Sequence, residues 1–246
     1  MARKFGWRPD KPDMRDEHYS MAAFGPLPEK VDLRKYCSAV QDQGDLGSCT
    51  GNAIASALEF LENKAGAARF ADYSRLFIYY NERSLEGTIM SDAGAEIRDG
   101  IKSVNKWGCC FESTWPYVIS KFTVKPSATA YTQAKTHLFT KYQRLTTLDQ
   151  FKNCLAAGYP FVFGFAVYES FESDAVAKTG NAPMPQPREQ MLGGHAVLAV
   201  GYDNSTSRFL VQNSWGTSWG QKGFFTLPYD YLANRNLSDD FWVIKA

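Results

Sequence analysis

The spacing of apolar residues changes near the middle of the chain. In the first half they recur at intervals of three and four, which is the spacing of one helix face. This pattern predicts helices over residues 49–64, 74–83 and 94–106. Ser74 is a candidate N-cap, and Gly108 stands where glycine commonly ends a helix. Residues 28 to about 125 are therefore expected to form a mainly helical unit.

The second half of the chain is predicted to be rich in strands. Thr147 and Gln150 have the spacing of a capping box, for a helix that ends at Gly158. Short apolar runs then predict strands over residues 161–168, 195–203, 208–212, 223–227 and 241–245. A helical unit followed by a β-rich unit, about residues 126–246, indicates the α+β class, and no internal repeat is visible.

A long polar connection, residues 171–192, leads directly into His195 and contains three prolines, Pro183, Pro185 and Pro187. It is longer than most loops in compact domains. Two interpretations stay open: a flap beside a functional cleft, or a surface insertion without a catalytic role.

The composition indicates a globular protein without a dominant charge. With 246 residues, of which 44% are hydrophobic, the chain can form one domain or two closely packed lobes. It has 27 basic and 26 acidic side chains, so its net charge of +1 does not favour nucleic acid or an anionic membrane as a partner. No apolar run approaches the roughly 20 residues that cross a bilayer.

The first 27 residues show no helical period. They begin with a basic stretch that runs into prolines and charges, without the apolar region of a secretory signal. The protein is therefore expected to act inside a cell, to have lost a leader, or to be exported by another route. The compartment stays open.

Three residues in the chain suggest nucleophilic chemistry. Cys49 begins the first predicted helix, where unpaired N–H groups and the helix dipole stabilise a thiolate. His195 begins an apolar strand and could share the thiol proton. Asn213 follows another strand. Each residue alone has an ordinary structural explanation, as a buried cysteine, a hydrogen-bonded histidine or a turn asparagine.

Together, these residues lie in motifs that resemble those of the papain family (C1-type, clan CA) of cysteine proteases. The motifs are Gln43-Gly-Asp-Leu-Gly-Ser-Cys49, Gly193-Gly194-His195 and Asn213-Ser214-Trp215-Gly216, in that order. The resemblance covers roughly residues 28–246. It includes Val31-Asp32-Leu33-Arg34, similar to the start of the mature family enzymes, and the turn Trp115-Pro116-Tyr117.

The resemblance implies a two-lobe papain-like fold, with a helical N-terminal lobe, a barrel-like β-rich C-terminal lobe and an active-site cleft between them. It implies that Cys49 is the nucleophile and His195 the general acid and base. Asn213 would orient the imidazole and Gln43 would help to hold the oxyanion. Neither a metal nor an organic cofactor is needed for this chemistry.

The resemblance also implies a substrate-binding surface. Gly94 and Ala95 would line the cleft, beside Trp215, which would also shield the His–Asn hydrogen bond. An apolar or aromatic side chain two residues before the scissile bond would enter a pocket near Gly193 and Gly194. No acidic residue stands next to these glycines in the sequence, so a preference for arginine is not expected.

The chain departs from the family pattern beside the nucleophile. The family usually has a disulfide-bonded cysteine three residues before it and an aromatic residue directly after it, but this chain has Leu46 and Thr50. This variant is most similar to a short-armed microbial branch of the family.

Besides Cys49 the chain has Cys37, Cys109, Cys110 and Cys154. These thiols allow at most two disulfides. A bridge from Cys37 to Cys109 or Cys110 and a fully reduced protein are both open, and no zinc-binding spacing accompanies them.

We therefore expect a cysteine-type peptidase that acts on peptides or proteins, in endopeptidase mode, through an acyl-enzyme. Two alternatives remain: an acyl-transfer amidase or transpeptidase on the same scaffold, and a catalytically silent binding protein. Residues 1–27 form an N-terminal arm, and residues 28–246 the peptidase domain. The arm, with anchors such as Trp7 and Tyr19, is either a short inhibitory propeptide over the cleft or a strap that stabilises a lobe. The oligomeric state is open.

Overall fold

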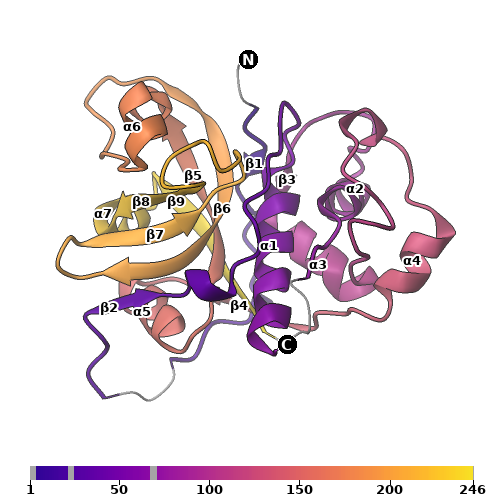
Figure 1. The fold of residues 1–246 in the computed structure, drawn as a ribbon, viewed down its shortest axis with the longest axis horizontal. Coiled ribbons are helices and arrows are strands. Elements are labelled where there is room, and N and C mark those ends of the chain that lie inside the picture. Colours follow the sequence, from indigo (N-terminus) through magenta and orange to yellow (C-terminus); the bar gives the residue numbers. More distant parts are fainter. Residues whose placement is uncertain (1–3, 22–24, 67–70, 246) are drawn as a thin grey trace.

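The computed structural model describes residues 4–21, 25–66 and 71–245. The longest helices come first and most strands later, as the apolar spacing predicts. Figure 1 shows the helices α1 to α4 on one side and a large twisted sheet on the other. The two-lobe papain-like fold predicted from the sequence is confirmed.

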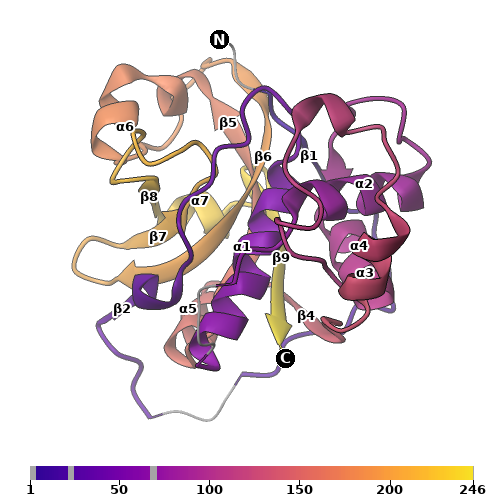
Figure 2. The same cartoon turned by 45° about the vertical axis from the view of Figure 1, so that its right-hand side comes forward.

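The helical lobe contains α1 (Cys49–Lys64), α2 (Arg75–Glu86), α3 (Ile97–Trp107) and α4 (Ala128–Ala134), with a 3-10 turn η2 (Ile119–Lys121). Ser74 caps α2 as predicted, because its hydroxyl accepts a hydrogen bond from the backbone N–H of Phe77. Gly87 ends α2 in the left-handed conformation that glycine adopts without strain. Figure 2 shows α1 in the centre of the molecule, where it packs against both α2 and the sheet.

The third predicted helix begins later than expected. Gly94 has a positive φ of 68°, and the two residues after it form β3 (Ala95–Glu96), so α3 starts only at Ile97. β3 pairs in parallel with β1 (Trp7–Arg8) of the N-terminal arm. This pairing joins residues about 88 positions apart, and the local apolar spacing of the sequence gives no sign of it.

The sheet is antiparallel and runs in the order β4-β9-β5-β6-β7-β8, with β2 on β6. Its strands are β2 (Lys30–Asp32), β4 (Lys141–Leu145), β5 (Phe161–Tyr168), β6 (Met191–Asp203), β7 (Arg208–Gln212), β8 (Phe224–Pro228) and β9 (Ser238–Lys245). Aromatic rings fill its interior, among them Phe161, Phe163 and Phe241. The division of the chain near residue 125 is therefore not strict, because β2 comes from the first part and joins the sheet of the second.

Three shorter helices accompany the sheet: α5 (Leu148–Ala156), α6 (Asp174–Thr179) and α7 (Tyr229–Ala233). Thr147 caps α5 as predicted. The 3-10 turns η1 (Arg34–Tyr36) and η3 (Glu169–Glu172) also lie on this side. The connection over residues 171–192 is not an irregular loop, since it contains α6 and the first residues of β6.

All five cysteines lie in the described ranges and all are thiols, so the bridge considered between Cys37 and Cys109 or Cys110 is not present. Within residues 4–21, 25–66 and 71–245, no helix is both long and apolar enough to cross a bilayer.

Candidate active site

Cys49 is the first residue of α1 and is completely buried. Its thiol is close to the backbone amides of Ala196, Gly6 and Thr50, which favour the thiolate. Burial has the larger effect and raises the pKa of the Cys49 thiol to about 11. The contact with Ala196 places the sulfur beside the start of the apolar stretch that follows His195.

His195 lies on β6 and is held by a hydrogen bond and by rings. Its Nε2 is 2.8 Å from Oδ1 of Asn213, and since this oxygen can only accept, Nε2 is the donor. The indole of Trp215 stacks on the imidazole at 4.7 Å between ring centroids, with an interplanar angle of 22°. Phe165 contacts the imidazole edge to face. This environment fixes the ring plane.

The side-chain amide of Gln43 is also fixed in orientation. Ser214 donates its hydroxyl hydrogen to Oε1 of Gln43 at 2.7 Å, so the NH₂ group must point the other way. That group donates to the carbonyl of Leu46 at 2.9 Å and to the carbonyl of Lys4, in the N-terminal arm, at 3.3 Å. Ser214 is a functional neighbour that sequence reasoning missed, although it directly follows Asn213.

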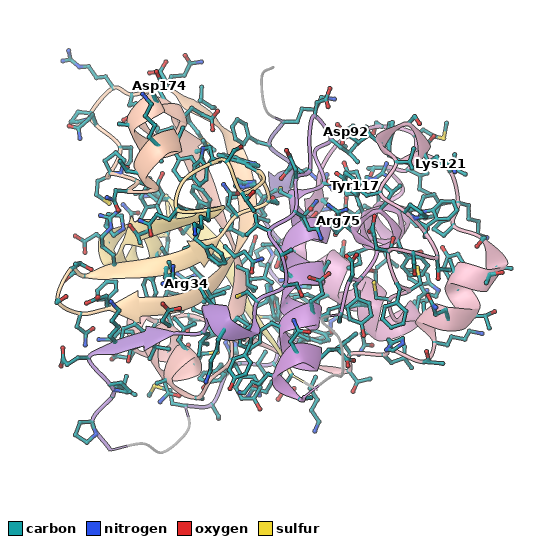
Figure 3. The ribbon with its side chains drawn as sticks, viewed as in Figure 1. Arg34, Arg75, Asp92, Tyr117, Lys121 and Asp174 are labelled. Carbon is teal, nitrogen blue, oxygen red and sulfur yellow. The ribbon has the colours of Figure 1, made fainter. Side chains whose placement is uncertain are left out.

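The loop over residues 43–48, which precedes Cys49, is held by side chains from the helical lobe. Asp92 accepts a hydrogen bond from the backbone N–H of Gly47 at 3.0 Å and another from the hydroxyl of Tyr79. Tyr117 donates its hydroxyl hydrogen to the carbonyl of Gln43 at 2.9 Å, and the guanidinium of Arg75 lies over its ring. Figure 3 shows Arg75, Tyr117 and Asp92 on the same side of the helical lobe, beside the beginning of α1.

The N-terminal arm lies in an extended conformation over these groups. Gly6 fits between Gly47 and Gly94 so closely that a Cβ on Gly6 would be 1.8 Å from the carbonyl oxygen of Gly47. Its own carbonyl accepts a hydrogen bond from the N–H of Ala95 at 2.8 Å. Phe5 contacts the rings of His195 and Trp215, each at 6.3 Å between centroids.

Trp7 fills a space beside the sheet, and we call this space the Trp7 pocket. Its indole lies against Gly164 of β5 and Gly194 of β6, where a Cβ would collide with the ring. Its Nε1 donates to Oδ2 of Asp240 at 3.0 Å. The five residues predicted to bind substrate, namely Gly94, Ala95, Gly193, Gly194 and Trp215, are thus all in contact with Phe5, Gly6 or Trp7.

Asp240, on β9, is the acidic residue that the sequence around the glycines did not reveal. It is 1% exposed and forms an ion pair with Arg144. Only the folding of β9 next to β5 brings it to the Trp7 pocket, 233 positions from Trp7 in the chain. Among the described residues, no group of three or more His, Cys, Asp or Glu side chains is placed to hold a metal ion.

Comparison with known proteins shows the family of the chain. The family model for papain family cysteine proteases matches residues 27–238. The chain belongs to the papain family. An uncharacterised peptidase C1-like protein of Acanthamoeba polyphaga mimivirus is 45% identical, over 100% of this chain and 88% of its own length. The crystal structure of xylellain, a cysteine protease from Xylella fastidiosa, superposes with a TM-score of 0.94 at 42% identity, covering 100% of this chain and 98% of that one.

More distant relatives of the papain family carry longer chains. Pro-cathepsin H of Bos taurus is 27% identical over a region that covers 92% of this chain and 68% of the pro-cathepsin H chain. Family membership makes this protein a cysteine protease, that is, a hydrolase that acts on peptides.

Proposed function

We propose that the protein is a papain-family endopeptidase that hydrolyses peptide bonds with Cys49, His195, Asn213 and Gln43, and that its own arm inhibits it. One observation carries the proposal: an extended peptide segment, Lys4–Trp7, already touches the nucleophile, the imidazole ring and the Gln43 amide. A site that accommodates a peptide in this manner has the shape to receive a peptide substrate.

The chemistry follows from the geometry. After the arm leaves, the Cys49 thiol gives its proton to His195, and the sulfur attacks the carbonyl carbon of the scissile bond. The resulting oxyanion is held by the Gln43 side-chain NH₂ and the Cys49 backbone N–H, and removal of one such donor typically costs about 2.7–4 kcal/mol of transition-state stabilisation. His195 then protonates the amine nitrogen, and the C–N bond breaks to leave a thioester.

Deacylation uses the same residues in reverse order. His195 takes a proton from water, and the hydroxyl oxygen attacks the thioester carbonyl. The C–S bond breaks, the acid product leaves and the Cys49 sulfur is regenerated. Oδ1 of Asn213 accepts a hydrogen bond from Nε2 of His195, and this bond keeps the imidazole in one tautomer and one plane.

The arm runs through the site in the direction opposite to that of a substrate. In a family substrate, the residue in the pocket comes before the residue whose carbonyl faces the oxyanion donors. In the arm, the carbonyl that faces Gln43 belongs to Lys4, and the residue in the pocket, Trp7, comes after it. No arm peptide bond is therefore presented to Cys49 in the orientation for attack, so the arm inhibits without being cut.

Endopeptidase mode is supported by the length of chain that the site holds. The arm extends past Cys49 on both sides, toward Trp215 through Phe5 and along β3 through Arg8. Once the arm leaves, a substrate could therefore pass through at both ends. We propose the same division as before, with residues 1–27 as the arm and residues 28–246 as the peptidase domain.

The test uses an epoxide inhibitor selective for papain-type thiolates and a set of fluorogenic peptides. In Gly6→Ala, the added methyl collides with the Gly47 carbonyl and should displace the arm, whereas Gly25→Ala is a matched control because nothing lies within 4 Å of its Cβ position. We expect one adduct and peptide hydrolysis in Gly6→Ala, little of either in wild type and Gly25→Ala, and neither in Gly6→Ala/Cys49→Ala.

Equal labelling of wild type and Gly6→Ala would refute inhibition by the arm. Absence of label and hydrolysis in every form would refute the peptidase and favour the silent binding protein. Products that carry an added amine in place of water would favour the acyl-transfer enzyme.

A further inference from the structure

The N-terminal arm changes its character at Asp10. Residues 4–9 lie over the active site, and we call them the plug. At Asp10 the side chain turns into the protein and becomes fully buried. Its carboxylate accepts hydrogen bonds from Nε1 of Trp242 at 2.8 Å and from the backbone N–H of Arg98 at 3.0 Å. Its own backbone N–H donates to Oδ2 of Asp240 at 2.7 Å.

Residues 10–19, which we call the strap, continue across both lobes. Arg98 of α3 donates to the carbonyl of Lys11 at 2.6 Å and pairs with Asp16 at 2.7 Å. The strap then adds a short backbone ladder to β4, since Tyr19 N–H donates to the carbonyl of Arg144 and Arg144 N–H donates to the carbonyl of Glu17.

Tyr19 anchors the end of the strap. It is 5% exposed, and its hydroxyl donates to Oδ1 of Asn153 on α5 at 2.9 Å. Gln150, also on α5, donates to the Tyr19 carbonyl at 3.1 Å. The strap thus joins α3 of one lobe to β4 and α5 of the other.

The strap carries the acidic partners of two inward-facing arginines. The side chain of Arg98 is 4% exposed and that of Arg144 is 14% exposed, and both lie close to Asp10 and Asp16. Loss of the strap would leave these charges with fewer partners, and an uncompensated buried charge is strongly destabilising.

The plug also contributes ion pairs, from Lys4 to Asp92 and from Arg8 to Glu86. Each of these carboxylates keeps a second partner when the plug leaves, because Asp92 also accepts from the backbone N–H of Gly47 and Glu86 from that of Glu96.

We infer that only the plug leaves on activation, and that the strap stays in the working enzyme as a wall of the active site. The strap holds Asp240 through Asp10, and together these residues form the floor of the Trp7 pocket. The pocket therefore selects a substrate side chain that carries an N–H donor at its tip, either basic or indole-like. This inference rests on the proposed peptidase function.

The arm itself illustrates the selection. Oδ2 of Asp240 accepts hydrogen bonds from both the Trp7 indole and the Asp10 N–H. When Trp7 leaves, a substrate donor can take its place. The charged groups around this floor are Asp10, Asp16, Asp239 and Asp240 with Arg98, Arg144 and Arg235. Burial and the neighbouring Asp240 carboxylate raise the pKa of Asp10 to about 7. A cation at the tip of a substrate side chain would relieve the repulsion between these two carboxylates, which an apolar side chain cannot do.

The first experiment separates plug from strap in the full chain. Gly6→Ala should hydrolyse peptides, whereas Tyr19→Ala should melt at least about 5 °C lower than wild type without gaining activity. Intact mass of the activated enzyme should give a first residue no later than Asp10. An active enzyme that lacks residues 10–19 and melts like wild type would overturn the permanent strap.

The second experiment measures side-chain selection in the Gly6→Ala chain. Peptides that differ only two residues before the scissile bond, with Arg, Trp or Leu, give kcat/KM ratios that a purely structural effect would not change. We expect Asp240→Asn to lower the Arg/Leu ratio about tenfold and Asp10→Asn to lower it about threefold, with Asp174→Asn on α6 as control. If Asp240→Asn does not fold, the Asp10→Asn ratio decides.

Unchanged ratios in folded Asp10→Asn and Asp240→Asn would overturn the selective floor while leaving the peptidase intact. Absence of hydrolysis and of epoxide label in Gly6→Ala would instead refute the proposed function. The melting temperature of Tyr19→Ala, compared with wild type, still tests the strap in that case.

Discussion

The two lobes hold their functional residues by different means. On the helical lobe, the loop over residues 43–48 is fastened by polar side chains, chiefly Asp92 and Tyr117. On the sheet lobe, His195 is surrounded by rings, with Trp215 stacked on it and Phe165 at its edge. An irregular loop has backbone groups that no ladder satisfies, so it needs side-chain partners. His195 lies within β6, where its pairing with Phe165 of β5 already fixes its backbone, and packing is enough to set the plane of its ring.

This difference also explains a departure from the family pattern. Where the family usually has a disulfide-bonded cysteine, the chain has Leu46, which packs against Leu76 and Tyr79. The adjacent N–H of Gly47 is bonded to Asp92. Noncovalent contacts therefore hold the loop on which the proposed oxyanion donors depend. Variants in each of the two lobes test this comparison, with activities measured in the Gly6→Ala chain.

The largest effect is expected for Asn213→Ala. If the hydrogen bond to Nε2 sets the tautomer of His195, its loss should lower kcat by a factor of about 10² to 10⁴, the range of general acid–base catalysis. Steady-state kinetics measure this, with the exposed Asn236→Ala as control. A loss below about threefold would mean that ring packing alone orients His195.

The next effect concerns the pH dependence of Cys49. Burial raises the pKa of the Cys49 thiol to about 11, so the neutral thiol dominates below that pH and alkylation should accelerate as the pH rises toward 11. Displacement of the plug hydrates the sulfur and lowers the pKa. At pH 7, Gly6→Ala should therefore react with iodoacetamide about a hundredfold faster at Cys49 than Gly25→Ala does. Peptide mapping by mass spectrometry gives the rates, and equal rates would contradict the role of the plug.

A smaller effect is expected for Asp92→Ala. The substitution leaves the Gly47 N–H and the Tyr79 hydroxyl without their acceptor, which should cost about 1–3 kcal/mol of unfolding free energy. It should also lower kcat more than KM changes, since the oxyanion donors move. Urea unfolding and kinetics measure both, against the exposed Asp45→Ala in the same loop. Unchanged stability would show that the loop does not depend on this carboxylate.

The smallest effect is expected for Tyr117→Phe. The ring and its contact with Arg75 remain, and only the hydroxyl that bonds the Gln43 carbonyl and Ser48 is lost. One such hydrogen bond contributes about 0.5–1.5 kcal/mol, so kcat should fall less than about tenfold. Tyr159→Phe provides a half-buried control. An equal change in both variants would mean that Tyr117 has no special role.

The sequence predicted what depends on local spacing. The start of α1 at Cys49, the cap at Ser74 and the bounds of β5 and β7 agree with the apolar pattern. It did not predict β1 and β3, because two-residue strands have no period of their own and exist only through their pairing.

The candidate site shows the same limit. Gln43, Cys49, His195 and Asn213 stand in recognisable motifs, whereas Asp240 and Gly164 do not, since they reach the Trp7 pocket only through the register of β5 and β9. The sequence also left open whether the arm is an inhibitor or a strap. We propose that residues 4–9 inhibit and that residues 10–19 form the strap. A change of role within ten residues cannot be predicted from amino-acid composition.

The fixed strap has a consequence for how strongly the plug must bind. Because the plug is tethered at Asp10 by a few residues, its effective concentration at the site is on the order of millimolar. A plug with an intrinsic dissociation constant of about 10 μM would then occupy the site roughly 99% of the time, and micromolar substrate would not displace it. The same plug, once severed and diluted, would be a weak ligand. Activity then depends on whether the chain between the plug and the strap is intact.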